Sequence, residues 1–92
     1  MINEYKKLNK EQQEYVYDVL NTVGKDAEKA PEFIRHAVVQ GSLDNYAEGV
    51  EGVDNVIALY LMGLQNNFRK SKDAYGQLIA LLKEIGQLNT GA

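Results

Sequence analysis

His36 is the only histidine in the 92-residue sequence, and the sequence contains no cysteine. A histidine metal site needs further ligands at spacings such as i, i+4, and no such partner accompanies His36. A catalytic triad needs a nucleophile, and the sequence has no nucleophile-elbow motif. We therefore interpret His36 as a surface or boundary residue and expect no catalytic residue, metal or cofactor.

Three acidic residues, Glu48, Glu51 and Asp54, are spaced three apart, so that a helix would gather them on one side. Calcium loops need the denser oxygen pattern D-x-[DN]-x-[DN]-G, which the sequence lacks. The glycines of the neighbouring EGVEGV run match no phosphate-binding motif. We interpret this acidic segment as a solvated face. Because no pair of titratable groups can be argued into one site, we expect a protein that is not an enzyme.

The most informative polar segment is 66–72, which places Arg69, Lys70 and Lys72 within four residues. One interpretation is that these cations compensate the dipole at the end of a helix. The other is that they contact an acidic partner or an anionic membrane surface, although three cations are fewer than the ~4–8 of a lipid-binding cluster. Both interpretations remain open from the residues alone.

The overall composition narrows the class of partner. A net charge of −3 and a pI near 5.0 disfavour a sequence-independent nucleic-acid binder. The longest apolar stretch, 56–64, is far shorter than the ~20 residues that span a bilayer. The polar first ten residues lack the apolar core of a signal peptide, and the absence of cysteine favours a reducing compartment. We therefore expect a cytoplasmic protein.

Apolar residues recur at helical spacing along most of the chain. The predicted elements are four helices and a loose tail, at about 9–23, 31–40, 50–67, 72–86 and 87–92. Asn9 and Gln12 form a capping-box pattern at the start of the first helix. Gly24 and Gly86 are expected to end the first and last helices, because glycine tolerates the left-handed conformation found there.

The two central helices differ in how clearly their apolar faces can be predicted. For the second helix, the expected face is Phe33, Ile34, Ala37 and Val38. Gly41 should end or kink this helix, and 42–52 stay open between helix and loop. The third helix has the strongest stripe, at Val53, Val56, Ile57, Tyr60, Leu61, Leu64 and Phe68. Four amphipathic segments with short connectors predict an all-α, single-domain, antiparallel four-helix bundle.

The C-terminal run VIALYLMGLQNNFRKSKDAYGQLIALLKEIGQ resembles the last two helices of the immunity proteins against pediocin-like (class IIa) bacteriocins, the enterocin A immunity-like family. The segments EQQEYVYDVLNTV and PEFIRHAVV fit the order and spacing of the first two helices of that family. The resemblance implies a small cytosolic antiparallel four-helix bundle without enzymatic activity. It also implies protection of the producer cell by intracellular binding to the mannose phosphotransferase permease that the bacteriocin has engaged.

In that family the C-terminal half recognises the bacteriocin. The resemblance therefore implies a partner-binding site near the membrane that includes Phe68, Arg69, Lys70, Lys72 and Tyr75, together with the tail after Gly86.

Two other hypotheses about function are compatible with the sequence. The chain could be a small helical inhibitor or adaptor of phage, plasmid or regulatory type that binds another protein. It could also pair with itself through the third helix, where Leu59 and Met62 widen the apolar stripe. We accordingly expect a protein partner, no nucleic acid, and a monomer or weak dimer.

Overall fold

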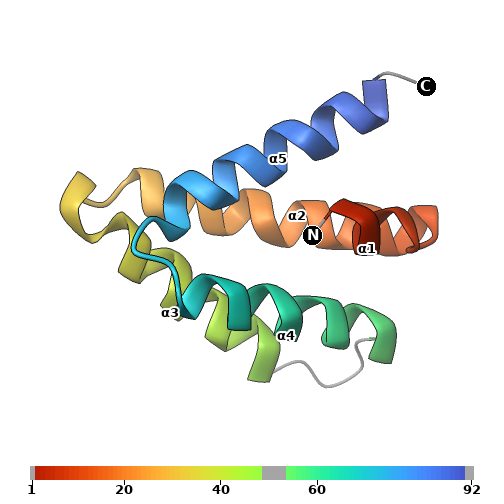
Figure 1. Cartoon of the computed structure of the whole chain (residues 1–92), viewed down its shortest axis with the longest axis horizontal. Coiled ribbons are helices and arrows are strands. Elements are labelled where there is room, and N and C mark those ends of the chain that lie inside the picture. The colour runs from red at the N-terminus through yellow and green to blue at the C-terminus, as the bar shows by residue number, and fades with distance from the viewer. Residues whose placement is uncertain (1, 49–53, 91–92) are drawn as a thin grey trace.

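The regular structure of the chain is helical throughout the residues that the computed structural model describes, 2–48 and 54–90 (Figure 1). The elements are α1 (Ile2–Lys6), α2 (Lys10–Glu28), the short 3-10 helix η1 (Glu32–Ile34), α3 (Arg35–Glu48), α4 (Asn55–Arg69) and α5 (Ala74–Thr90). The prediction of an all-α fold is confirmed. None of the helices in the described ranges is both long enough and apolar enough to cross a membrane.

Helix α2 begins as predicted but ends later. Asn9 and Gln12 form the reciprocal capping box, with hydrogen bonds of 2.8 and 2.9 Å between side chain and backbone. Gly24 does not end the helix, which continues to Glu28. Gly24 is buried against α5, and a Cβ built on it would lie 3.5 Å from Leu82 Cδ1. The glycine thus allows α2 and α5 to pack closely. The burial of Ala27 favours the extra helical turn beyond Gly24.

The apolar face predicted for the second helix is confirmed only in part, since Val38 packs against the core but Ala37 is exposed. Phe33 is 78% exposed and Ile34 is 37% exposed, whereas Val39 and Leu43 are fully buried. Because η1 winds at about three residues per turn, it changes the register of the helix that follows. Gly41 neither ends nor interrupts α3, which covers 42–48 of the segment left open above, and 49–53 lie outside the described residues.

Helix α4 carries the predicted core stripe. Its buried residues are Ile57, Tyr60, Leu61, Leu64, Gln65 and Phe68. Within the described residues α4 begins at Asn55, and Asp54 caps it by accepting a hydrogen bond from the Val56 backbone N–H at 2.8 Å. The start predicted at residue 50 and the apolar residue at 53 lie outside the described residues. Val56 belongs to the predicted stripe but is half exposed.

Helix α5 starts two residues later and ends later than predicted. The Asp73 carboxylate caps the helix by accepting a hydrogen bond from the Gly76 N–H at 3.1 Å, and Ser71 Oγ accepts one of 3.1 Å from the Asp73 N–H. Gly86 does not end the helix, and 87–90 are helical rather than a loose tail. The extension is favoured because Ile85 is fully buried and Leu88 packs against the core.

The helices pack around α3, which contacts α2, α4 and α5, while α2 also packs against α5. The short α1 joins the core through Tyr5, which is 1% exposed and whose hydroxyl donates to the Gln13 carbonyl at 3.2 Å. The radius of gyration, 12.6 Å, is close to the ~12 Å expected for a compact chain of this length. This packing brings η1 and the α4–α5 turn to the same end of the molecule (Figure 1).

Candidate functional site

The residues predicted to bind a partner lie at and beside the turn between α4 and α5, but not all of them reach the surface. Arg69, Lys70 and Lys72 are exposed, and Tyr75 is half-buried. Phe68 is fully buried and belongs to the hydrophobic core. A partner at this surface would therefore meet the three cations and part of Tyr75, whereas the Phe68 ring positions the end of α4 from within.

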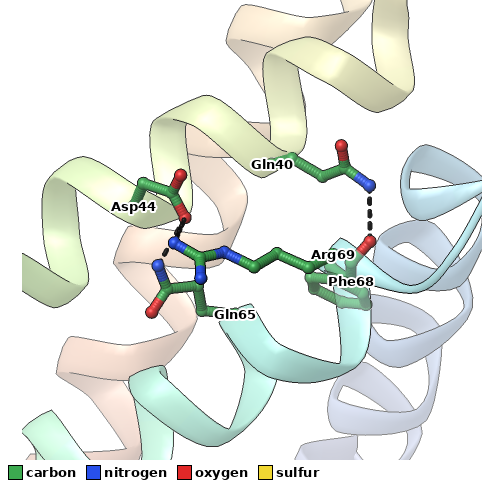
Figure 2. A network of polar contacts seen from close by, with 5 residues as sticks. All are labelled: Gln40, Asp44, Gln65, Phe68 and Arg69. Atoms are coloured by element: carbon green, nitrogen blue, oxygen red, sulfur yellow. Dashed lines mark hydrogen bonds and ion pairs between the residues drawn. The ribbon is translucent and has the colours of Figure 1, made fainter.

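Gln40 of α3 holds the backbone of this turn. Its side-chain amide donates hydrogen bonds to the Phe68 carbonyl and, at 3.0 Å, to the Ser71 carbonyl; the first contact is drawn in Figure 2. The last carbonyls of a helix have no partner within the helix, so an outside donor stabilises them. The turn is thus fixed by a side chain about thirty residues earlier in the sequence.

Asp44, one turn further along α3, orients the last residues of α4 (Figure 2). Its Oδ1 accepts a hydrogen bond from the Gln65 side-chain amide and lies 3.6 Å from Arg69 Nη2. Gln65 is 8% exposed, and a buried amide of this kind requires a partner. The Arg69 and Asp44 side chains are 54% and 36% exposed, so their ion pair contributes only ~0–1 kcal/mol. Its main effect is to direct Arg69 toward α3.

Tyr75 is joined to α3 by Arg35, a residue that the sequence did not indicate. The Arg35 guanidinium carbon lies 5.3 Å from the centroid of the Tyr75 ring, within the range of a cation–π contact. The same side chain donates hydrogen bonds of 3.2 Å to the carbonyls of Glu28 and Ala30. Arg35 therefore closes the C-terminal end of α2 and links it to the first turn of α5.

A shallow pocket of about 380 Å³ lies beside this contact, between η1, α3 and the start of α5. Its lining includes the exposed Phe33 ring, His36, Lys72 and Asp73. Aromatic, cationic and anionic groups are mixed there, a combination that suits the side chains of another protein. Within the described ranges, no three histidine or acidic side chains gather in a way that could hold a metal ion.

Asp54 has a structural role at the opposite end of α4. Besides capping the helix, its carboxylate accepts a hydrogen bond of 2.9 Å from the Gln12 side-chain amide of α2. This hydrogen bond, and secondly the one from the Val56 backbone, holds the pKa of Asp54 below its ordinary value of 3.8. The acidic face predicted around Asp54 therefore includes a contact between two helices. Glu51, its neighbour in that prediction, lies outside the described residues.

A second surface lies between α1 and the first half of α4. It is a groove of about 500 Å³ whose apolar lining includes Leu8, Leu59, Tyr60 and Gly63. Tyr60 is 9% exposed, and this burial raises its pKa well above the ordinary value of 10. A buried phenol of this kind stays neutral, so Tyr60 contributes apolar contact to a groove whose charged lining residues are Glu4 and Lys7.

The fold and these surfaces define a small all-helical protein with an exposed basic turn at one end and an apolar groove along α4. Comparison with known protein families, curated proteins and solved structures finds no match to the chain.

Proposed function

We propose that the chain is a bacteriocin immunity protein, which protects a producer cell by binding, from inside the cell, a sugar permease engaged by a pediocin-like bacteriocin. In this proposal the four longer helices correspond to the antiparallel four-helix bundle of that family, and α1 is an addition to it. The observation that carries the proposal is the basic α4–α5 turn, whose cations are exposed while its backbone is held by Gln40.

The basic turn suits a partner at the cytoplasmic face of a membrane. Anionic lipids attract cations near the surface by about 1 kcal/mol for each Lys or Arg. Lys70 and Lys72 are exposed and supply such charges. Because the backbone of the turn is already ordered, binding would cost little additional conformational entropy. No catalytic group is required, since occlusion of a pore needs only a stable contact.

Protection of living cells tests this proposal. The chain is expressed in a bacteriocin-sensitive lactic acid bacterium, and the cells are challenged with a panel of pediocin-like peptides. We expect survival against one peptide and its loss in Lys70→Ala plus Lys72→Ala. The matched control, Lys6→Ala plus Lys10→Ala, removes the same charge from exposed positions on α1 and α2 and should preserve survival.

The outcomes separate the role from the site. Sensitivity to every peptide, with the protein shown to be expressed and folded, would reject the immunity role. Survival that is equal in both double variants would keep the role and remove the basic turn as its site.

A second function, that of a small protein-binding inhibitor or adaptor, is favoured by the apolar side of α4. Leu59 and Met62 are 68% and 46% exposed, and large exposed apolar groups often mark protein interfaces. This function predicts that Leu59→Ser abolishes binding of the partner protein, whereas the lysine variants leave that binding intact.

A further inference from the structure

One end of the molecule, formed by 25–36 and 68–76 and called here the η1 end, exposes apolar side chains that the sequence predicted for the core (Figure 1). Phe33 is 78% exposed, more than any other large apolar side chain of the described residues, and its neighbour Ile34 is 37% exposed. The Phe33 ring borders the shallow pocket of about 380 Å³ that Lys72 also lines. Two adjacent apolar side chains exposed beside a cation form a candidate contact surface.

Charge is distributed unevenly between the η1 end and the rest of the chain. The η1 end contains six Lys or Arg and four Asp or Glu, whereas the remaining residues contain four and nine. This end is therefore positive, although the whole chain has a net charge of −3. Among the described residues no carboxylate pairs with Lys70 or Lys72, so both charges are available to a partner. The charge distribution thus turns this end toward an anionic surface.

We propose that the η1 end docks on the surface of an anionic lipid bilayer, with Phe33 and Ile34 inserted at the boundary between headgroups and acyl chains. Proteins that lie on a bilayer combine apolar side chains that enter this boundary with cations that meet the headgroups. Lys70 and Lys72 supply the cations, and each Lys near an anionic surface strengthens the attachment. The exposed ring and the unpaired cations of this end then serve one contact.

The small size of the surface favours a bilayer over a folded protein. A standard protein interface buries ~800 Å² on each partner, more than a 3-10 helix of three residues and a short turn supply. A bilayer sets no such minimum, because each inserted side chain and each cation contributes separately. The backbone is also ordered in advance, since Gln40 holds the turn and Arg35 joins the end of α2 to α5.

Two carboxylates beside the Phe33 ring oppose this contact to different degrees. Asp73 accepts a hydrogen bond of 3.1 Å from the Gly76 N–H, so its charge is offset by the positive N-terminal end of α5. Glu32 is exposed, and among the described residues no cation pairs with it. Glu32 therefore repels an anionic surface. Because of this repulsion we expect weak attachment, with a dissociation constant on the order of 1 mM in accessible lipid.

Co-sedimentation of the full chain with phosphatidylglycerol vesicles measures the contact, at up to about 5 mM lipid and about 20 mM salt. Phosphatidylcholine vesicles should bind much less, and about 0.5 M salt should abolish most of the binding, because salt screens the charges. Phe33→Ser should weaken binding about tenfold. Leu59→Ser is the matched control, because it removes a side chain that is 68% exposed on the uncharged part of α4, and it should leave binding unchanged.

Charge variants test which side of the molecule faces the bilayer. Lys70→Ala plus Lys72→Ala should weaken binding by about tenfold or more, whereas Lys6→Ala plus Lys10→Ala, with the same change in net charge, should have a much smaller effect. Glu32→Gln should strengthen binding by about fivefold, because it removes the opposing charge. Circular dichroism of each variant without vesicles establishes that it retains its helices.

Three results would overturn the inference. The first is no binding to phosphatidylglycerol vesicles at low salt; if Phe33→Ser still abolished protection in living cells, the η1 end would instead contact a protein. The second is equal binding to neutral vesicles, which would remove the lysines from the contact. The third is binding that is lost in Leu59→Ser and retained in Phe33→Ser, which would place the contact on α4. The inference does not depend on the immunity role, because the vesicles contain neither a bacteriocin nor a permease.

Discussion

The two ends of α4 present opposite kinds of surface. At the C-terminal end, Gln40 and Asp44 of α3 fix the backbone and Arg69, and the exposed groups of the turn are cations that water solvates well. At the N-terminal end, Asp54 and Gln12 make one polar contact between helices, while the next exposed groups along the helix are large and apolar. The same helix is therefore held at both ends by side-chain amides but offers different chemistry to a partner.

This difference separates two modes of binding. A cationic turn attracts an anionic partner over a distance, and salt screens that attraction beyond about 10 Å. An apolar stripe gains free energy only when water leaves it, roughly 25 cal/mol for each Å² buried. We assign the first mode to the proposed permease contact and the second to the alternative function of binding another protein, and the two surfaces lie at different parts of α4.

The largest expected effect concerns Phe68, whose ring anchors the C-terminal end. Phe68→Ala should lower the free energy of unfolding by about 3–5 kcal/mol, because it removes a fully buried aromatic ring and leaves a cavity. Phe33→Ala, at a ring that is 78% exposed, should change it by no more than about 0.5 kcal/mol. Urea denaturation followed by circular dichroism measures both. Equal losses in the two variants would contradict the placement of Phe68 in the core.

A smaller effect is expected for Gln40, whose side-chain amide supports the C-terminal end of α4. Gln40→Ala removes hydrogen bonds to two carbonyls of the turn and should cost about 1–2 kcal/mol. Amide hydrogen exchange should accelerate at 70–73 more than in the first half of α4, because only the turn loses its support. Gln77→Ala, at an exposed position of α5, is the control. Uniform acceleration along α4 would show that Gln40 supports the whole helix and not the turn.

The sequence predicted the interior of the helices better than their ends. The core of α4 follows directly from the 3.6-residue period, as the burial of Ile57, Leu61 and Leu64 shows. Gly24 and Gly86 matched the local pattern of a helix end, yet both helices continue. Each extension depends on burial against another helix, and a local pattern contains no information about such contacts.

The site shows the same limit. The lysines of the turn are exposed, as their type and position predict. Phe68 fitted both the apolar stripe and the polar turn, so the sequence alone could not place it. Its position is determined by packing in the hydrophobic core. Gln40, Asp44 and Arg35 act on residues that are 5 to 40 positions away, several of them through backbone carbonyls. Contacts of this kind have no fixed spacing in the sequence, so local motifs did not indicate these three residues.

The smallest expected effect is the pH dependence at the N-terminal end of α4. Hydrogen bonds from Gln12 and then from the Val56 backbone lower the pKa of Asp54 below 3.8. A carboxylate with a lowered pKa in the folded state stabilises the fold fully above its ordinary pKa, and this contribution is lost as the pH falls through the lowered value. An NMR titration of the Asp54 carboxyl carbon should therefore have its midpoint below 3.8. Gln12→Ala should raise the midpoint, because it removes the larger of the two causes, whereas Gln77→Ala should not. If Gln12→Ala left the midpoint unchanged, the contact between α2 and the start of α4 would not hold in solution, and the polar anchoring of α4 would be confined to its C-terminal end.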